Sequence, residues 1–183
     1  MLSVRGGTGF ANALRRALCS DIESWAPCHV DVRSNTSCQH DEYIAHRIGL
    51  VPFRRIVKDG PDEMRVDRTG PCTVTAADLV GPSFDPVHPG IEVIVLGKDQ
   101  RLDATVTFDR KPASKHARYA RCAAVGMRHN HADGTHDILF EPLDPKEPPH
   151  EAMHDALDAI ERRVDDALRQ LADQPSVPPK SMC

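Results

Sequence analysis

The chain has 183 residues, which is enough for one domain or for two small domains. Its 23 Lys and Arg residues are outnumbered by 27 Asp and Glu residues, giving a formal net charge of -4. A protein that binds nucleic acid through its own surface usually carries a basic excess, so we expect any action on DNA or RNA to run through partner proteins.

The first third of the chain predicts two helices around a strand. A glycine-rich turn leads into a helix over residues 10–24, whose apolar residues recur every three or four positions: Phe10, Leu14, Leu18, Ile22 and Trp25. Arg15 and Arg16 fall on the opposite side of that helix. Alternation over residues 28–33 predicts a half-buried strand. A second helix is predicted over residues 41–50, where Pro52 stops it.

The middle of the chain predicts a mixed, loop-rich unit. Pro and Gly punctuate short β-like runs at residues 72–75, 91–96 and 102–108. A further strand is expected at residues 135–143, followed by a Pro-broken loop over residues 144–149. The character of the sequence therefore changes between about residue 51 and residue 134.

The last predicted helix carries the most regular pattern in the sequence. Its apolar residues repeat at intervals of four and three and form a heptad seam: Met153, Leu157, Ile160, Val164, Ala167 or Leu168, and Leu171. Such a helix packs either on its own domain or against a partner subunit, and the pattern alone leaves both interpretations open. Three prolines make the tail at residues 174–183 irregular.

No group of residues predicts a catalytic or metal site. Acids and histidines at His40, Asp41, Glu42 and His46 lack a nucleophile or cofactor motif beside them. Cys28 and His29 are adjacent on a predicted strand and point to opposite faces, so they do not converge on one ion with Cys38 and His40. The three histidines His129, His131 and His136 are interpreted as part of a solvated loop.

The six cysteines include no Cys-x-x-Cys pair, and no apolar run approaches the roughly 18 residues of a membrane span. No secretory signal peptide is recognisable, so reduced thiols inside a cell are expected. We therefore predict no catalytic residue, no metal and no cofactor.

Three stretches of the sequence resemble one known family. The run from Phe10 to Leu18, Phe-Ala-Asn-Ala-Leu-Arg-Arg-Ala-Leu, is similar to the signature helix of RNA polymerase alpha-type subunits. Asn35-Thr36-Ser37, followed by His-Asp-Glu-Tyr-Ile-Ala-His-Arg-Ile-Gly-Leu-Val-Pro from His40, resembles the archaeal and eukaryotic branch, which includes the third-largest subunit of RNA polymerase II and its archaeal counterpart. Weaker matches resemble the family's inserted domain, at residues 75–79, 96–102 and 115–119.

The resemblance implies an α+β fold and a role in assembly. A discontinuous dimerisation domain of sheet and long helices would comprise residues 1–50 and 135–173, and an inserted mixed, β-rich domain would comprise residues 51–134. The protein would pair with a smaller alpha-like subunit through Met153, Leu157, Ile160, Val164, Leu168 and Leu171. It would contact the beta-type large subunit through Asn12, Arg15, Arg16, His46 and Arg47. Nucleotidyl transfer itself would belong to the large subunits.

Two departures from the family pattern shape further expectations. Only residues 1–5 precede the signature helix, where the family has a longer strand, and only Cys72 lies near the place of the family's metal-binding cysteine cluster. Both features suggest a trimmed, metal-free version from a large DNA virus or a divergent eukaryote, located in the host nucleus, cytoplasm or virion. The rival interpretations are a standalone hydrolase using His, Asp and Glu, and a free regulatory dimerisation protein.

Overall fold

The computed structural model describes residues 2–5, 7–132 and 134–173, and the tail predicted to be irregular at residues 174–183 lies outside them. The helices of the described chain are α1 (Thr8–Ser20), α2 (Asp41–Gly49) and α3 (Pro149–Ala172), with short 3-10 turns η1 (Ala76–Asp78) and η2 (Ala117–Tyr119). The strands form small antiparallel sheets. The predicted α+β class is confirmed. No helix in the described ranges is long and apolar enough to span a membrane.

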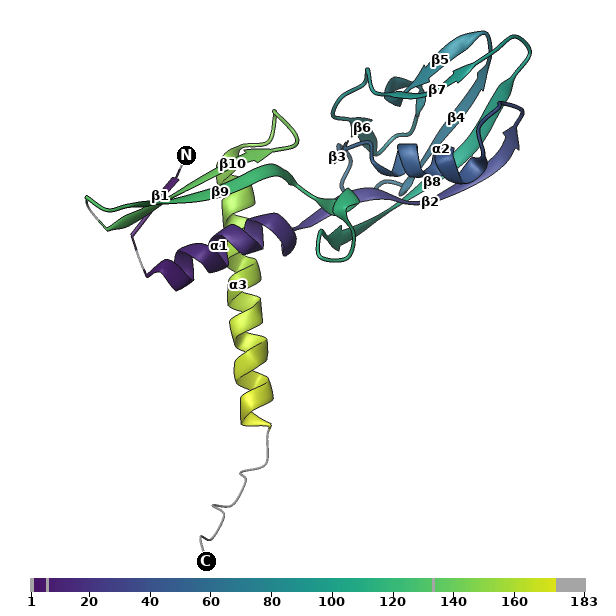
Figure 1. The fold of residues 1–183 in the computed structure, drawn as a ribbon. Helices are drawn as coiled ribbons and strands as arrows, with labels where there is room; N and C mark the ends of the chain where they lie inside the picture. Colours follow the sequence, from purple (N-terminus) through teal and green to yellow (C-terminus); the bar gives the residue numbers. More distant parts are fainter. Residues whose placement is uncertain (1, 6, 133, 174–183) are drawn as a thin grey trace, which may run out of the picture.

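The two ends of the chain build one hydrophobic core. A three-stranded sheet in the order β1 (Leu2–Val4), β10 (Thr135–Pro142) and β9 (Cys122–Asn130) packs with α1 and α3, which cross each other (Figure 1). We call its buried residues the terminal core: Leu14, Ala17, Leu18, Ile22, Cys122, Ile138, Ala152, Met153 and Ala156.

The middle of the chain builds a second core on the other side of the molecule (Figure 1). Its sheet has the order β2 (Glu23–Asn35), β8 (Arg101–Pro112) and β4 (Glu63–Thr69), and α2 packs against β2. Two further strand pairs join it: β3 (Phe53–Arg55) with β6 (Phe84–Pro86), and β5 (Cys72–Thr75) with β7 (Glu92–Leu96). The buried residues of this central core come from α2 and these strands, among them Ile44, Ile48, Val66, Phe84, Leu102 and Val106.

Helix α1 is shorter than the sequence predicted. The backbone N–H groups of Asp21 and Ile22 both donate to the carbonyl oxygen of Ala17, at 2.9 and 3.3 Å, and end the helix. Trp25 therefore lies in β2, and its predicted place on the apolar face of the helix is wrong. Phe10, predicted to be buried, is 45% exposed, because Ala11 faces the core in the first turns instead.

The strand predictions succeed where apolar residues alternate. The strands predicted at residues 72–75, 91–96, 102–108 and 135–143 are confirmed as β5, β7, β8 and β10. The middle region is less loop-rich than predicted, since it also contains β4, in which Met64 and Val66 alternate with exposed residues. Strand β9 was missed because exposed alanine, glycine and histidine residues hide any alternation, and its pairing with β10 forms it.

Candidate partner-binding surfaces

Helix α3 carries the predicted heptad seam, and the seam divides into an inner and an outer part. Met153 is buried and Ile160 packs against the terminal core. Beyond Ile160 the seam becomes exposed, from 52% at Val164 to 64% at Leu171, and Leu157, three residues before Ile160, is 39% exposed. The outer turns of α3 extend away from the rest of the molecule (Figure 1). The inner part therefore packs on its own domain, while the outer part presents an uncovered apolar face.

A groove between α1 and α3 continues this apolar face. It has a volume of about 350 Å³ and is lined by residues from both helices: Ala13, Arg16, Ile160, Arg163, Val164, Ala167 and Leu168. Arg163 Nη1 lies 2.5 Å from Asp21 Oδ2 and so ties α3 to the end of α1. Sequence reasoning missed Ala13 and Arg163, because only the crossing of the two helices brings them to the seam.

The two arginines of α1 have different surroundings. Arg15 is half-buried and donates from Nε and Nη2 to Asn12 Oδ1, at 3.1 and 3.0 Å. Arg16 is exposed and lines the groove beside α3. Asn12 and Arg15 thus form one preorganised polar pair, whereas Arg16 lies with the predicted dimerisation residues.

The segment Asn35-Thr36-Ser37 builds the loop that leads into α2. Asn35 donates from Nδ2 to Asp41 Oδ1 at 2.7 Å, and its Oδ1 accepts from the backbone N–H of Ser37 at 3.0 Å. Thr36 Oγ1 accepts from the backbone N–H of Arg101 at 2.7 Å. The first turn of α2 then carries Asp41 and its last turn carries Arg47, an order that favours the helix dipole. Contacts within this chain therefore account for Asn35, Thr36 and Asp41 in this segment.

The end of α2 is held against the central core by arginines. Arg47 is half-buried, donates to the carbonyl oxygen of Glu92 in β7 and lies 5.9 Å from the ring centroid of Tyr43, whereas His46 is exposed. A Cβ added at Gly49 would lie 3.3 Å from Nη1 of Arg118, so glycine leaves room for that guanidinium. Two segments that resemble the family, 40–52 and 115–119, thus meet at this point.

Tyr119 fixes the position of η2. Its hydroxyl donates to Asp109 Oδ1, and its side chain is buried. Burial, together with that hydrogen bond, raises the pKa of Tyr119 to about 12. Burial also raises the pKa of Asp109, but hydrogen bonds from Lys111 and Tyr119 outweigh burial and hold that pKa below its ordinary value.

The histidines, cysteines and acids that could bind a metal ion or act as an acid or base do not form a site in the described ranges. His40, Asp41, Glu42 and His46 are exposed on α2 and its cap. Within the described ranges, no three His, Cys, Asp or Glu side chains are arranged to hold a metal ion. His129 lies with its ring centroid 4.5 Å from that of His131 and 4.6 Å from that of His136. His136 is buried, which corrects its interpretation as part of a solvated loop.

The predicted large-subunit contacts lie in two separate places. Asn12, Arg15 and Arg16 are on α1 in the terminal half, whereas His46 and Arg47 are on α2 beside the central core (Figure 1). The structure does not bring these two groups together.

Comparison with known proteins finds several archaeal relatives. The chain is 27% identical over 173 residues to the DNA-directed RNA polymerase subunit Rpo3 of Methanocaldococcus jannaschii, which covers 93% of this chain and 89% of that protein. It is 37% identical over 133 residues to Rpo3 of Natronomonas pharaonis, covering 69% of this chain and 53% of the relative. The chain belongs to the RNA polymerase alpha-type subunit family.

Coverage of the other alpha-type relatives is partial. Rpo3 of Pyrococcus horikoshii is 33% identical over 105 residues, which is 51% of this chain and 40% of that protein. The chain thus aligns with nearly all of one alpha-type relative and with about half of the length of others. A scan against protein-family models finds no match.

Proposed function

We propose that this chain is a non-catalytic assembly subunit of a multisubunit DNA-dependent RNA polymerase. The relatives' name, DNA-directed RNA polymerase subunit, supports membership of such an enzyme. The net charge of -4 supports action through protein partners. Nucleotidyl transfer and its metal ions would belong to the large subunits.

Pairing with a smaller alpha-like subunit would use the exposed residues of the α3 seam, most of which lie in its outer part. The observation that carries this proposal is the uncovered apolar face of Leu157, Val164, Leu168 and Leu171. Fully covering an aliphatic side chain contributes roughly 1.5–3 kcal/mol, so several such residues favour a stable partner. The charged residues between them keep the remaining faces of the helix in water.

Contact with the beta-type large subunit would use α1. The Asn12–Arg15 pair presents a guanidinium already oriented by two hydrogen bonds. An oriented guanidinium suits bidentate recognition of a carboxylate or carbonyl on the partner. Arg16 would serve pairing through α3 as well, and His46 and Arg47 would form a separate contact on α2.

The domain division implied by the family resemblance is part of this proposal. Residues 1–50 and 135–173 would form the dimerisation domain, and residues 51–134 the inserted domain. Two separate cores support a division into two units, but Ile44 and Ile48 lie in the central core and Cys122 lies in the terminal core, so the proposed boundaries differ from those of the cores. Assembly into a polymerase implies a location inside the cell, in the nucleus or cytoplasm, or in the virion of a virus.

Co-purification tests the proposal. The tagged full chain is expressed in its native source, and the material that remains bound through size exclusion is identified by mass spectrometry. We expect both a small alpha-like subunit and the two large polymerase subunits in one peak. A free regulatory dimerisation protein would elute with the small partner alone, and a standalone hydrolase would elute with neither.

A further inference from the structure

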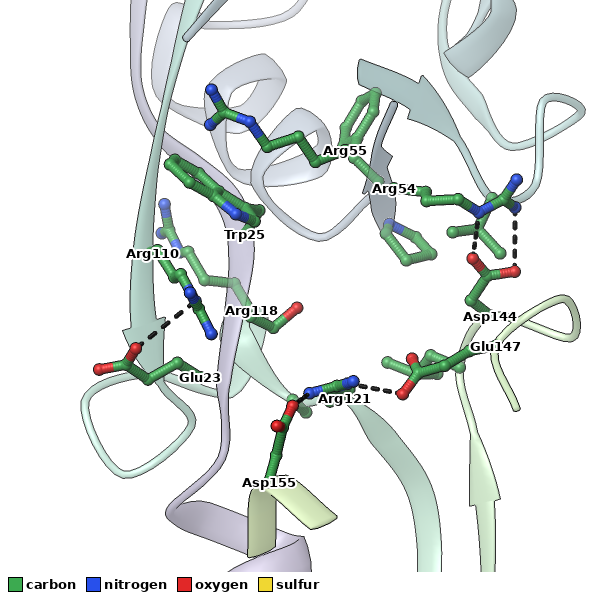
Figure 2. A pocket seen from close by; sticks show the side chains of 16 residues that line it. Glu23, Trp25, Arg54, Arg55, Arg110, Arg118, Arg121, Asp144, Glu147 and Asp155 are labelled. Atoms are coloured by element: carbon green, nitrogen blue, oxygen red, sulfur yellow. Dashed lines mark hydrogen bonds and ion pairs between the residues drawn. The ribbon is translucent and has the colours of Figure 1, made fainter. Parts of the chain in front are cut away.

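A polar pocket lies where the two cores meet. It has a volume of about 260 Å³, and its walls come from β2, β3, β8, the segment around η2, the loop after β10 and α3. Figure 2 shows side chains from these distant segments pointing toward one another. Apolar groups contribute to the lining, among them Trp25, Phe53, Val87 and Leu143.

Arginines outnumber acids by one in the lining of this pocket. Five arginines line it, namely Arg54, Arg55, Arg110, Arg118 and Arg121, together with four acids, namely Glu23, Asp144, Glu147 and Asp155. Arg54 is neutralised by Asp144, and Arg121 by Glu147 and Asp155. The guanidinium of Arg55 lies 4.1 Å from the ring centroid of Trp25 and pairs with Asp62 outside the pocket.

The two remaining arginines are weakly engaged. Arg110 Nε lies 3.5 Å from Glu23 Oε2, and this is its sole ion pair in the described part of the chain. Arg118 donates from Nη1 to the carbonyl oxygen of Pro27 at 2.7 Å and from Nε to His116 Nδ1 at 3.3 Å. Its Nη2 has no hydrogen-bond partner among the described residues. Figure 2 places both guanidinium groups beside Trp25, which is opposite Arg110 in the register of β2 and β8.

We infer that this pocket binds a carboxylate side chain from an acidic segment of a neighbouring polymerase subunit. The inference rests on the proposed function, because that neighbour is part of the same assembly. Arg110 and Arg118 would supply charge-assisted hydrogen bonds, and the ring of Trp25 would cover the aliphatic part of the incoming side chain. Arginine and tryptophan are the residue types that most often dominate binding energy at interfaces.

A nucleic-acid strand does not fit the same pocket. Binding at this pocket needs only one carboxylate to reach Arg110 while the rest of its segment stays outside. The volume of about 260 Å³ also suits one or two side chains rather than a chain of nucleotides.

Trp25 allows a direct test, because it is the one tryptophan in the sequence. The full chain is titrated with capped hexaglutamate while the fluorescence of Trp25 is followed. Inorganic phosphate and capped hexalysine are titrated in parallel. Arg110→Glu and the milder Arg110→Gln are compared with Arg33→Glu, a control on an exposed residue of β2 with the same charge change.

We expect hexaglutamate to change the fluorescence saturably. Its apparent Kd should weaken on the order of tenfold or more in Arg110→Glu, less in Arg110→Gln and not in Arg33→Glu. No saturable change, equal binding to Arg110→Glu, or equally tight binding of phosphate would overturn the inference. The titration needs no polymerase, so its failure is distinct from failure of the chain to co-purify with the large subunits.

Discussion

Arg54 in β3 and Asp144 in the loop before α3 form a two-point ion pair across the junction of the two cores, with Arg54 Nη2 2.9 Å from Asp144 Oδ1. The two residues are 90 positions apart in the sequence. Burial alone would raise the pKa of Asp144, but hydrogen bonds from Arg54 and the backbone N–H of Lys146 outweigh it and hold the pKa below its ordinary value. The pair therefore couples the orientation of the two halves to a charged carboxylate.

Asp144→Asn should destabilise the chain by about 1–2 kcal/mol at neutral pH. This loss is smaller than for a fully buried ion pair, because the side chain of Arg54 is 29% exposed. A carboxylate with a lowered pKa in the folded state contributes stability above its unfolded pKa and loses it as the pH falls through the folded value. The difference from wild type should thus shrink below about pH 4. Urea unfolding at neutral pH and below about pH 4 measures this difference in stability. Asp166→Asn, on the exposed face of α3, is the control.

The outer seam of α3 should govern pairing without supporting the fold. Leu168→Asp leaves the isolated chain stable, because Leu168 is 59% exposed, but it places an unpaired charge in the partner interface. Ile160→Asp should lose both pairing and stability, since Ile160 packs on the terminal core. Co-expression pull-down with the small partner and thermal melting distinguish the two variants. Undiminished recovery of the small partner by Leu168→Asp contradicts the role of the seam.

Arg15 and Arg16 should differ in the partners that they contact, because Arg16 also lines the groove beside α3. Arg15→Ala should reduce recruitment of the beta-type subunit, where loss of a paired arginine costs on the order of 2–5 kcal/mol. Arg16→Glu should weaken pairing with the small subunit, because Arg16 lines the groove beside Val164. Arg16→Glu should melt close to wild type, since exposed substitutions stay within about 0.5 kcal/mol. Arg15→Ala should melt slightly lower, because half-buried Arg15 also loses its two hydrogen bonds to Asn12. Large-subunit and small-partner pull-downs from one preparation show whether the effects separate in this way.

His136→Phe should stabilise the chain. The His136 side chain is buried, and neither ring nitrogen has a hydrogen-bond partner among the described residues. Replacing such a group by an apolar ring of similar shape removes a desolvation penalty of about 1–3 kcal/mol. Thermal unfolding should show a higher Tm for His136→Phe and little change for His129→Phe, whose side chain is exposed. A lower Tm for His136→Phe would show that the imidazole has a partner such as an ordered water.

The folded protein should hold no stoichiometric zinc or iron. The prediction rests on Cys72 being the sole cysteine near the family's cysteine-cluster position in the printed sequence. Elemental analysis after dialysis against a mild chelator measures it, and about one metal ion per chain would refute it.

The sequence by itself determined the elements whose residues interact locally. Alternation identified β5, β7, β8 and β10, and the spacing of Leu14 and Leu18 identified α1. The heptad repeat identified α3 and its apolar seam. These signals depend on periods of two and 3.6 residues, which any segment displays without its neighbours.

Tertiary structure decided which of those residues meet. Edge strand β9 is formed by its pairing with β10. Trp25 lies in a strand and not in the predicted helix, because β2 pairs with β8. The division of the α3 seam at Ile160 follows from where α1 crosses it. The pocket around Arg110 gathers segments from Glu23 to Asp155, and contacts over such separations leave no periodic trace in the sequence.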